Sequence, residues 1–407
     1  MAQKREYKIL DYIVIFLLII NVASASTLCY NFMYVMASLL FILAMALSNK
    51  FVFRPIIVYV LLYCVLVEIA ASCYLSNSLN LYRLFNYIYP ILFAYCSISI
   101  LKTRLLPLLE RVIFFLTIFS LPLFCLQLIN LPFIESLSSL FSQFLAEPLR
   151  YENSWYAFIF NYCSLREGTL ITRNSGFMWE PGAFAMVLVI MIVYRLVCNG
   201  DKLKDTHVLI YLIALATTFS TAGYIALLLI LISVLFKKRS IGVRFSMLLV
   251  VVAMILLMFR LDFINVKISE YITNTEDFVY AESGESNAIE FNRYLYFLYT
   301  GQKVLEFPIG YGTSDVEYNG YMVIAPNGLA NIMYHWGLIG LLFLSLAFYR
   351  FVGYFKVKLP VICLILLGLA MFVVMFSNPV DKSPILYIVI LITFLIPYNL
   401  YESSSRM

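Results

Sequence analysis

The sequence predicts an all-α polytopic membrane protein, and three observations lead to that class. The chain is 63% hydrophobic and only 13% charged, whereas a soluble domain typically carries about 25% charged residues. The apolar residues form long unbroken runs without strand alternation. Only helices and closed barrels satisfy their backbone in lipid, and runs of about 20 apolar residues have the length of a spanning helix. We therefore expect about 12 transmembrane helices.

The predicted spans follow the apolar runs in chain order. The first run leads directly into a second one, so we interpret it as a span and not as a cleavable signal peptide. The stretch 207–236 is too long for one ordinary span and short for two, and we expect it to break at Ser220–Gly223. The predicted spans are 9–28, 31–47, 51–73, 84–101, 112–131, 181–198, 207–219, 222–236, 243–260, 328–349, 359–376 and 384–400.

The distribution of basic residues predicts which side each connection faces. Most of the 28 Lys and Arg residues lie in alternate connections, whereas the short connections between them contain only Arg83 and Lys382. Basic connections remain in the cytoplasm, and the alternation holds only if 207–236 crosses twice. Both termini are therefore predicted to be cytoplasmic, and the two long connections, 132–180 and 261–327, are predicted to lie on the outer, periplasmic side.

These spans and loops divide the chain into five regions. They are an N-terminal five-helix membrane region (1–131), a first long outer loop (132–180), a four-helix membrane region with the broken pair (181–260), a second long outer loop (261–327) and a C-terminal three-helix membrane region (328–407). In the second loop, Asn287 followed by Glu290 resembles a capping box, which predicts a helix from there to about Leu305.

Cysteine and histidine usage predicts neither a disulfide framework nor a metal site. Seven of the eight cysteines lie in or at the edges of apolar runs, where free cysteine behaves as a small hydrophobic residue. His207 and His335 are the only histidines, and no Cys/His or carboxylate cluster has metal-ligand spacing. We expect no metal and no cofactor.

The stretch Thr172–Gly182 is the first candidate for chemistry. Pro181 suits the first turn of a helix, so Glu180 is predicted beside free backbone N–H groups at the helix start. Arg173, seven residues upstream, offers the planar donors that suit a phosphate. In a functional interpretation Arg173 holds a diphosphate and Glu180 removes a proton from a hydroxyl. In a structural interpretation Glu180 caps the helix and pairs with Arg173.

Three further ionisable residues lie near the same predicted face. Arg293 belongs to the second long loop and is a second phosphate-binding candidate, or an interfacial residue among aromatic neighbours. His335, about two turns inside a span, is a second candidate for the general base, or a hydrogen-bonded residue between packed helices. Glu68, near the outer end of the third span, is expected to pair with an outer-loop arginine or to reach the interface.

Several short motifs together resemble a known family. They are Arg173-Asn-Ser-Gly-Phe-Met-Trp-Glu-Pro-Gly-Ala-Phe-Ala185, Thr218-Phe-Ser-Thr-Ala-Gly-Tyr224 between two half-length spans, Pro308-Ile-Gly-Tyr-Gly312, Asn327, and Gly337-Leu-Ile-Gly340. Over roughly residues 165–350 the chain resembles the bacterial Wzy-type O-antigen and exopolysaccharide repeat-unit polymerases, which are related to O-antigen ligases.

The resemblance implies a polytopic, GT-C-like glycosyltransferase of the bacterial inner membrane that uses neither a metal nor a nucleotide sugar. Such an enzyme serves lipopolysaccharide or capsule biosynthesis. It moves a growing glycan from undecaprenyl diphosphate onto the non-reducing end of a lipid-linked repeat unit, and displacement from the opposite face inverts the anomeric centre. A chain-length regulator protein is an implied partner and nucleic acid is not.

The family's motifs also assign residues. Arg173 and Arg293 match arginines that family members carry in their two large outer loops. Asn174, Tyr311 and Asn327, in the same motifs, are further candidates for substrate binding. Ligases usually show a His directly before an Asn at the start of the span after the second loop, where this chain has Pro326-Asn327. That departure counts against a ligase and leaves the general base open between Glu180 and His335.

Two other functions remain as alternatives. A ligase would transfer finished polymer to an outer acceptor such as lipid A. A transporter or flippase for the same lipid-linked sugar would suit the broken spans, although charged residues in transporters tend to lie near the membrane midplane.

Overall fold

The computed structural model describes most of the predicted spans and parts of both long loops. The described residues are 8–23, 32–48, 54–76, 78–130, 132–134, 136, 160–161, 172–199, 205–236, 279–280, 288–355, 359–379 and 381–397. The predicted span 243–260 and most of the first long loop lie outside them.

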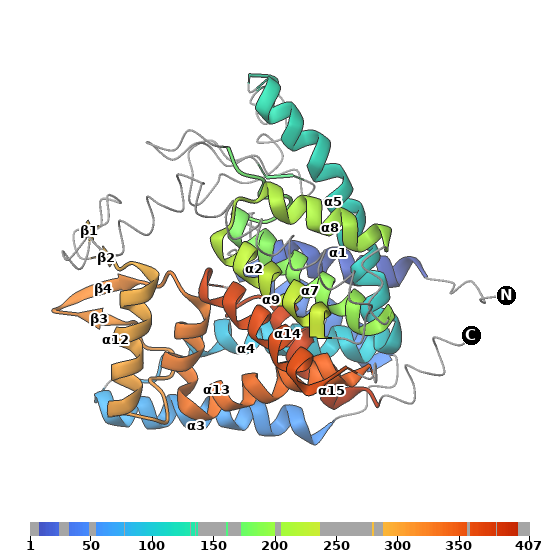
Figure 1. The fold of residues 1–407 in the computed structure, drawn as a ribbon. Helices are drawn as coiled ribbons and strands as arrows, with labels where there is room; N and C mark the ends of the chain where they lie inside the picture. The colour runs from blue at the N-terminus through green and yellow to red at the C-terminus, as the bar shows by residue number, and fades with distance from the viewer. Residues whose placement is uncertain are drawn as a thin grey trace.

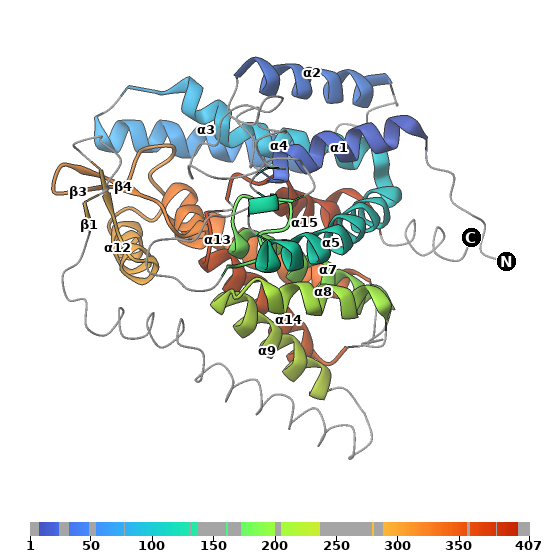
Figure 2. The same cartoon turned by 90° about the horizontal axis from the view of Figure 1, so that it is seen from above.

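Helices dominate the described part of the chain (Figures 1 and 2). The helices are α1 (Ile9–Ala23), α2 (Phe32–Ser48), α3 (Pro55–Leu75), α4 (Leu81–Leu101), α5 (Leu105–Ile129), α7 (Pro181–Asn199), α8 (Thr206–Thr217), α9 (Thr221–Phe236), α12 (Arg293–Glu306), α13 (Gly328–Tyr354), α14 (Val361–Phe376) and α15 (Pro384–Leu395), with a 3₁₀ turn at Lys102–Arg104. Most begin or end within a few residues of the predicted spans. The helix predicted to start at 112 begins instead at Leu105, seven residues earlier.

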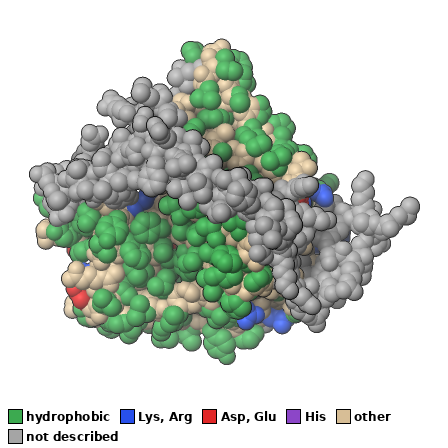
Figure 3. Space-filling view, viewed as in Figure 1, with side chains coloured by type: hydrophobic (Ala, Val, Ile, Leu, Met, Phe, Trp, Pro, Cys, Tyr) green, Lys and Arg blue, Asp and Glu red, His purple; other side chains and the backbone are tan. Residues whose placement is uncertain are grey.

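Four helical stretches are long and apolar enough to cross a membrane, namely Pro55–Leu75, Leu81–Ile129, Pro181–Cys198 and Gly328–Tyr354, and six shorter apolar helices accompany them in the described chain. Their outward faces carry large hydrophobic side chains, among them Phe119 on α5 and Leu342 on α13. Hydrophobic side chains also cover much of the visible surface in Figure 3. Such a surface suits helices that face lipid, and it indicates a membrane-embedded protein.

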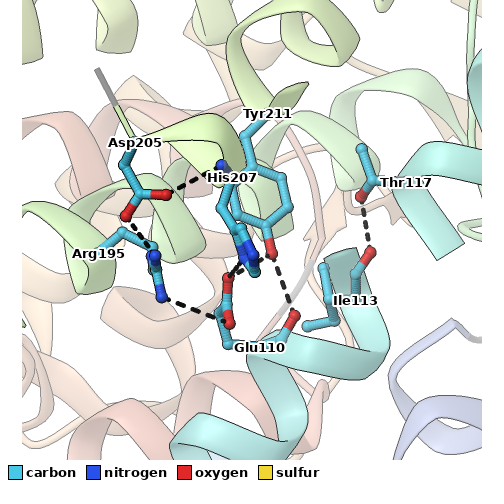
Figure 4. Close-up of polar contacts among 7 residues, drawn as sticks. All are labelled: Glu110, Ile113, Thr117, Arg195, Asp205, His207 and Tyr211. Carbon is cyan, nitrogen blue, oxygen red and sulfur yellow. Dashed lines mark hydrogen bonds and ion pairs between the residues drawn. The ribbon is translucent and has the colours of Figure 1, made fainter. Parts of the chain in front are cut away.

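One end of the bundle, which we call the Glu110 end, gathers charged residues from four helices and the turns beside them. Arg104 pairs with Asp11, which joins the start of α5 to the start of α1. His207 Nδ1 lies 2.7 Å from Glu110 Oε1, and its ring stacks on Phe114 at 3.6 Å. Figure 4 shows Arg195 and Tyr211 beside the same carboxylate and Asp205 paired with Arg195, where the end of α7 meets the starts of α5 and α8.

The opposite end, which we call the Glu180 end, contains the starts of α7 and α9. Helix α8 runs from the Glu110 end to the Glu180 end, and α9 runs back again. The break between them lies at Thr218–Ser220, next to the predicted break at Ser220–Gly223. The return of α9 is shown by Cys363 at the start of α14, whose Sγ donates to Ser233 O near the end of α9. In Figure 2, α8, α9 and α14 lie on one side of the bundle, and α1 and α2 on the other.

A small sheet beside α12, at the left of Figure 1, was not predicted for this all-α chain. Its strands are β1 (Val279–Tyr280), β2 (Ala288–Glu290), β4 (Tyr321–Ile324) and β3 (Glu317–Tyr318), in that order, and β2 and β4 are parallel. The prediction of a helix starting at Asn287 is wrong, because residues 288–290 pair with β4 and bury Ile289. Asn292 caps α12 instead, accepting from Tyr294 N and Leu295 N.

Helix α13 is interrupted at Gly337, where φ is 61° and ψ is −163°. The turn Pro308–Gly312 packs into this interruption. The kink frees two carbonyl groups of α13 from helical hydrogen bonding, and both accept hydrogen bonds from the turn. Tyr311 N donates to Tyr334 O at 2.8 Å, and Gly312 N donates to His335 O at 3.1 Å. A Cβ on Gly337 would lie 2.2 Å from Pro308 O. The glycine motif of the second loop therefore fastens that loop to α13.

Candidate functional site

The segment that contains Arg173 lies against the turn between α8 and α9. Arg173 Nε donates to Thr218 O at 3.1 Å. Asn174 N donates to Thr217 O at 3.0 Å, and Asn174 Nδ2 donates to Thr217 Oγ1 at 2.9 Å. Asn174 Oδ1 also accepts from Gly176 N, where a φ of 54° suits glycine. The break between the two short helices thus positions the half-buried Arg173 side chain.

Glu180 directly precedes α7, as the Pro181 signal predicts. Its carbonyl accepts from Phe184 N at 3.1 Å, which is the first helical hydrogen bond of α7. The side chain is half-buried and its Oε1 atom is buried. Free N–H groups at a helix start favour a negative charge nearby, so the carboxylate has a favourable electrostatic setting. Glu180 and Arg173 lie at the same end of the bundle.

A chain of contacts connects this segment to Arg293. Two residues after Glu180, Gly182 packs against the side chain of Asn378. Asn378 O accepts from Gly328 N at 2.8 Å, at the start of α13. The preceding residue, Asn327, caps α13 and donates from Nδ2 to Arg293 O at 3.3 Å. The structure therefore places the backbone of Arg293 and the start of α7 on either side of one short group of polar contacts.

Arg293 is the first residue of α12 and is half-buried. Among the described residues, no carboxylate lies within ion-pair distance of its guanidinium, whereas Arg83 on α4 pairs with Asp315 at 2.6 Å. The planar donors of Arg293 are therefore available to an anionic ligand.

His335 is buried, and both of its ring nitrogens have partners. Nδ1 lies 2.6 Å from Gly312 O, and Nε2 lies 2.7 Å from the hydroxyl of Tyr87. Because a carbonyl only accepts, Nδ1 carries the proton and the Tyr87 hydroxyl donates to Nε2. This geometry corresponds to the structural interpretation of His335, which joins the Pro308–Gly312 turn to α4.

The further substrate-binding candidates are buried in the fold. Asn174 and Asn327 are both fully buried and use their side chains in the contacts above. Tyr311 stacks on Tyr334 with ring centroids 4.7 Å apart, and its hydroxyl donates to Lys303 O at 3.0 Å. Burial raises the pKa of Tyr311 to about 12. These three residues support the residues around the site, and their polar side-chain atoms are used in hydrogen bonds within the protein.

The expectation that Glu68 pairs with an arginine or reaches the interface is wrong. Its carboxylate is buried and accepts from Thr313 N at 2.7 Å and from Thr313 Oγ1 at 2.9 Å. The second loop supplies the partner through Thr313, because the Pro308–Gly312 turn brings Gly312 directly against Glu68.

The sequence interpretation missed the link between α14 and α15. Asp381 is buried there, and its Oδ1 accepts from Asn331 Nδ2 at 3.0 Å. Asn331 Oδ1 in turn accepts from the Tyr296 hydroxyl at 2.7 Å. Burial raises the pKa of the Asp381 carboxyl, and the adjacent Lys382 opposes that shift. The sequence signal was a short polar link between two apolar runs, which is also the pattern of an ordinary exposed turn.

Within the described residues, no three His, Cys, Asp or Glu side chains gather in a way that would hold a metal ion. Comparison of the chain with protein-family models, with curated proteins and with solved structures finds no match.

Proposed function

We propose that this protein is a Wzy-type polysaccharide polymerase, an inverting glycosyltransferase that moves a growing glycan from undecaprenyl diphosphate onto the non-reducing end of a lipid-linked repeat unit. In this proposal the chain crosses the bacterial inner membrane twelve times, both termini are cytoplasmic, and the Glu180 end faces outward. The observation that carries the proposal is the contact chain through Asn378 and Asn327, which brings the segments of Arg173 and Arg293 to one end of the bundle.

The two arginines supply the charge that a diphosphate leaving group requires. Donors placed where negative charge develops lower the barrier of such a transfer, because they need no rearrangement during the reaction. Arg173 donates from Nε to Thr218 O at 3.1 Å, which places its guanidinium group at the break between α8 and α9. Arg293 has no carboxylate partner among the described residues. A guanidinium group presents several planar donors, so both side chains suit an anion that arrives with the lipid.

Glu180 is the general base in this proposal. The acceptor hydroxyl needs a base within hydrogen-bond reach, and Glu180 lies between the segments of the two arginines in the contact chain. His335 would have to break its hydrogen bond with Tyr87 before its Nε2 could accept a proton. The geometry thus favours Glu180 over His335 for this role.

The test uses purified protein and lipid-linked repeat units in buffer containing a chelator, with the glycan products separated on a gel. We expect a ladder of lengthened glycans, and we expect Arg173→Ala or Arg293→Ala to reduce their rate of formation by about 100-fold or more. Arg83→Ala is the matched control. It removes an arginine at the same end whose exposed pair with Asp315 contributes little to stability.

Two results would reject the proposal. The first is the absence of lengthened glycan when the protein is folded and the repeat unit is intact. The second is an equal effect of Arg83→Ala and Arg293→Ala, because that would show a general charge effect at this end.

A further inference from the structure

Several buried polar side chains near Glu180 have atoms without a hydrogen-bond partner in the described part of the chain. Native proteins keep nearly all buried polar groups paired, so such atoms require an explanation, and a ligand is one. The atoms come from three segments: Ser175 Oγ and Trp179 Nε1 before α7, Thr221 Oγ1 at the start of α9, and Asn378 Nδ2 and Oδ1, Asp381 Oδ2 and Ser383 Oγ in the α14–α15 link.

These segments meet around the first turn of α7. A Cβ on Gly182 would lie 2.6 Å from both Nδ2 and Oδ1 of Asn378, so the amide lies flat against the glycine backbone. A Cβ on Gly223, in the first turn of α9, would lie 3.1 Å from the Cβ of Ala185. The first turn of α9 is therefore in contact with the second turn of α7. The amide of Asn378 lies against Gly182, which is two residues beyond Glu180.

The unpartnered atoms are held in fixed positions. Asn378 is 1% exposed, and its backbone carbonyl accepts from Gly328 N. Asp381 is 2% exposed and is fixed through Oδ1 by Asn331. Side chains held in this way lose little conformational freedom when a ligand binds, which favours binding.

The chemistry of these atoms matches a polyhydroxylated ligand. Asn378 offers a donor and an acceptor, Thr221 offers a hydroxyl, and Trp179 offers an indole N–H. Neutral hydroxyl groups both donate and accept, so they can pair with all of these atoms. A diphosphate instead requires cations, and the carboxylate of Asp381 would repel it.

We propose that Asn378, together with Thr221 and Asp381, binds hydroxyl groups of the saccharide that the lipid carries, directly beside Glu180. This inference rests on the proposed function and deepens it, because it divides the site into two parts. The arginines hold the diphosphate, and the start of α9 and the α14–α15 link hold the sugar.

The experiment measures binding of two probes to the full chain in lipid nanodiscs. One probe is undecaprenyl diphosphate without sugar, and the other is the lipid-linked repeat unit extracted from the cells that make the protein. The variants are Asn378→Leu and Thr221→Val. The matched control is Thr393→Val, because Thr393 Oγ1 is also buried without a partner but lies near the opposite end, where Arg350 donates to its carbonyl.

We expect Asn378→Leu to weaken binding of the repeat unit about tenfold, which corresponds to about 1.4 kcal/mol. We expect Thr221→Val to weaken it severalfold, and neither variant to change binding of undecaprenyl diphosphate. Thr393→Val should change neither affinity. The ligand-free protein should melt at the same or a higher temperature with Asn378→Leu, because leucine has a similar size and removes an unpartnered amide.

The outcomes separate this inference from the proposed function. If the wild-type protein binds the repeat unit but Asn378→Leu and Thr221→Val bind it equally well, the sugar-binding assignment is overturned and the function stands. A lower melting temperature for ligand-free Asn378→Leu would show that the amide has a structural role, and would also overturn the assignment. If the wild-type protein binds neither probe, both proposals are refuted.

Discussion

Replacing Gly337 by alanine tests the fastening of the second loop to α13. The φ of 61° with ψ of −163° lies in a region that only glycine adopts readily, and a side chain there costs about 1–3 kcal/mol. The added Cβ would also lie 2.2 Å from Pro308 O and 2.4 Å from Ile309 O, both of which are backbone atoms. The turn must therefore move away from the kink.

Movement of the turn would break three hydrogen bonds, from Tyr311 N to Tyr334 O, from Gly312 N to His335 O and from Leu338 N to Pro308 O. At about 1 kcal/mol for each bond, added to the backbone strain, the expected loss of stability is about 4–6 kcal/mol. The measurement is unfolding of the purified protein in mixed micelles as SDS is titrated, followed by circular dichroism and gel filtration.

Gly353→Ala in the same helix is the control. A Cβ there would approach nothing closer than Leu364 Cδ1 at 4.0 Å, and alanine favours a helix over glycine by about 1 kcal/mol. We therefore expect Gly353→Ala to be neutral or stabilising. If Gly337→Ala unfolds at the same SDS fraction as Gly353→Ala, the close packing of the turn into the kink is refuted.

Three further predictions concern buried polar groups. Burial raises the pKa of Asp381, so the folded protein binds this proton more tightly than the unfolded chain does. The stability of the protein should therefore fall as the pH rises from about 4 through the raised value. Thermal melts across a pH series should show that Asp381→Asn abolishes this fall and is more stable than wild type at neutral pH. Glu68→Leu should leave Thr313 N without an acceptor and cost about 1–3 kcal/mol. Equal melting temperatures for variant and wild type would contradict this. His207→Phe keeps the stacking on Phe114 but loses the contact with Glu110 that Figure 4 shows. A double-mutant cycle with Glu110→Gln should therefore give a coupling energy of about 0.5–3 kcal/mol. A coupling energy of zero would show that this contact does not contribute to stability.

The sequence was sufficient to locate the helices because their signal is local. An unbroken apolar run identifies a helix wherever it packs, and Pro181 marks the start of α7 by its own backbone chemistry. For the same reason Glu180 could be placed at a helix start, and the break between α8 and α9 could be placed within two or three residues.

The sequence was insufficient where a residue's role depends on distant partners. His335 hydrogen-bonds Tyr87, 248 positions away, and Glu68 binds Thr313, 245 positions away. No local pattern predicts such pairs. The capping signal at Asn287 was overridden by pairing of β2 with β4, since a tertiary contact that buries Ile289 outweighs a weak local preference. Asn378 and Asp381 were missed because burial, and not residue type, sets them apart.

The shortness of the broken pair has a consequence for the surrounding bilayer. Helix α8 has 12 residues and α9 has 16, so their lengths are about 18 Å and 24 Å, against a hydrocarbon thickness of roughly 30 Å. If both helices cross the bilayer as we propose, this hydrophobic mismatch would thin the lipid layer beside them. Under the proposed function, the Thr218–Ser220 break would then lie below the level of the surrounding headgroups, and the lipid-borne diphosphate would meet Arg173 there without its acyl tail being drawn out of the membrane.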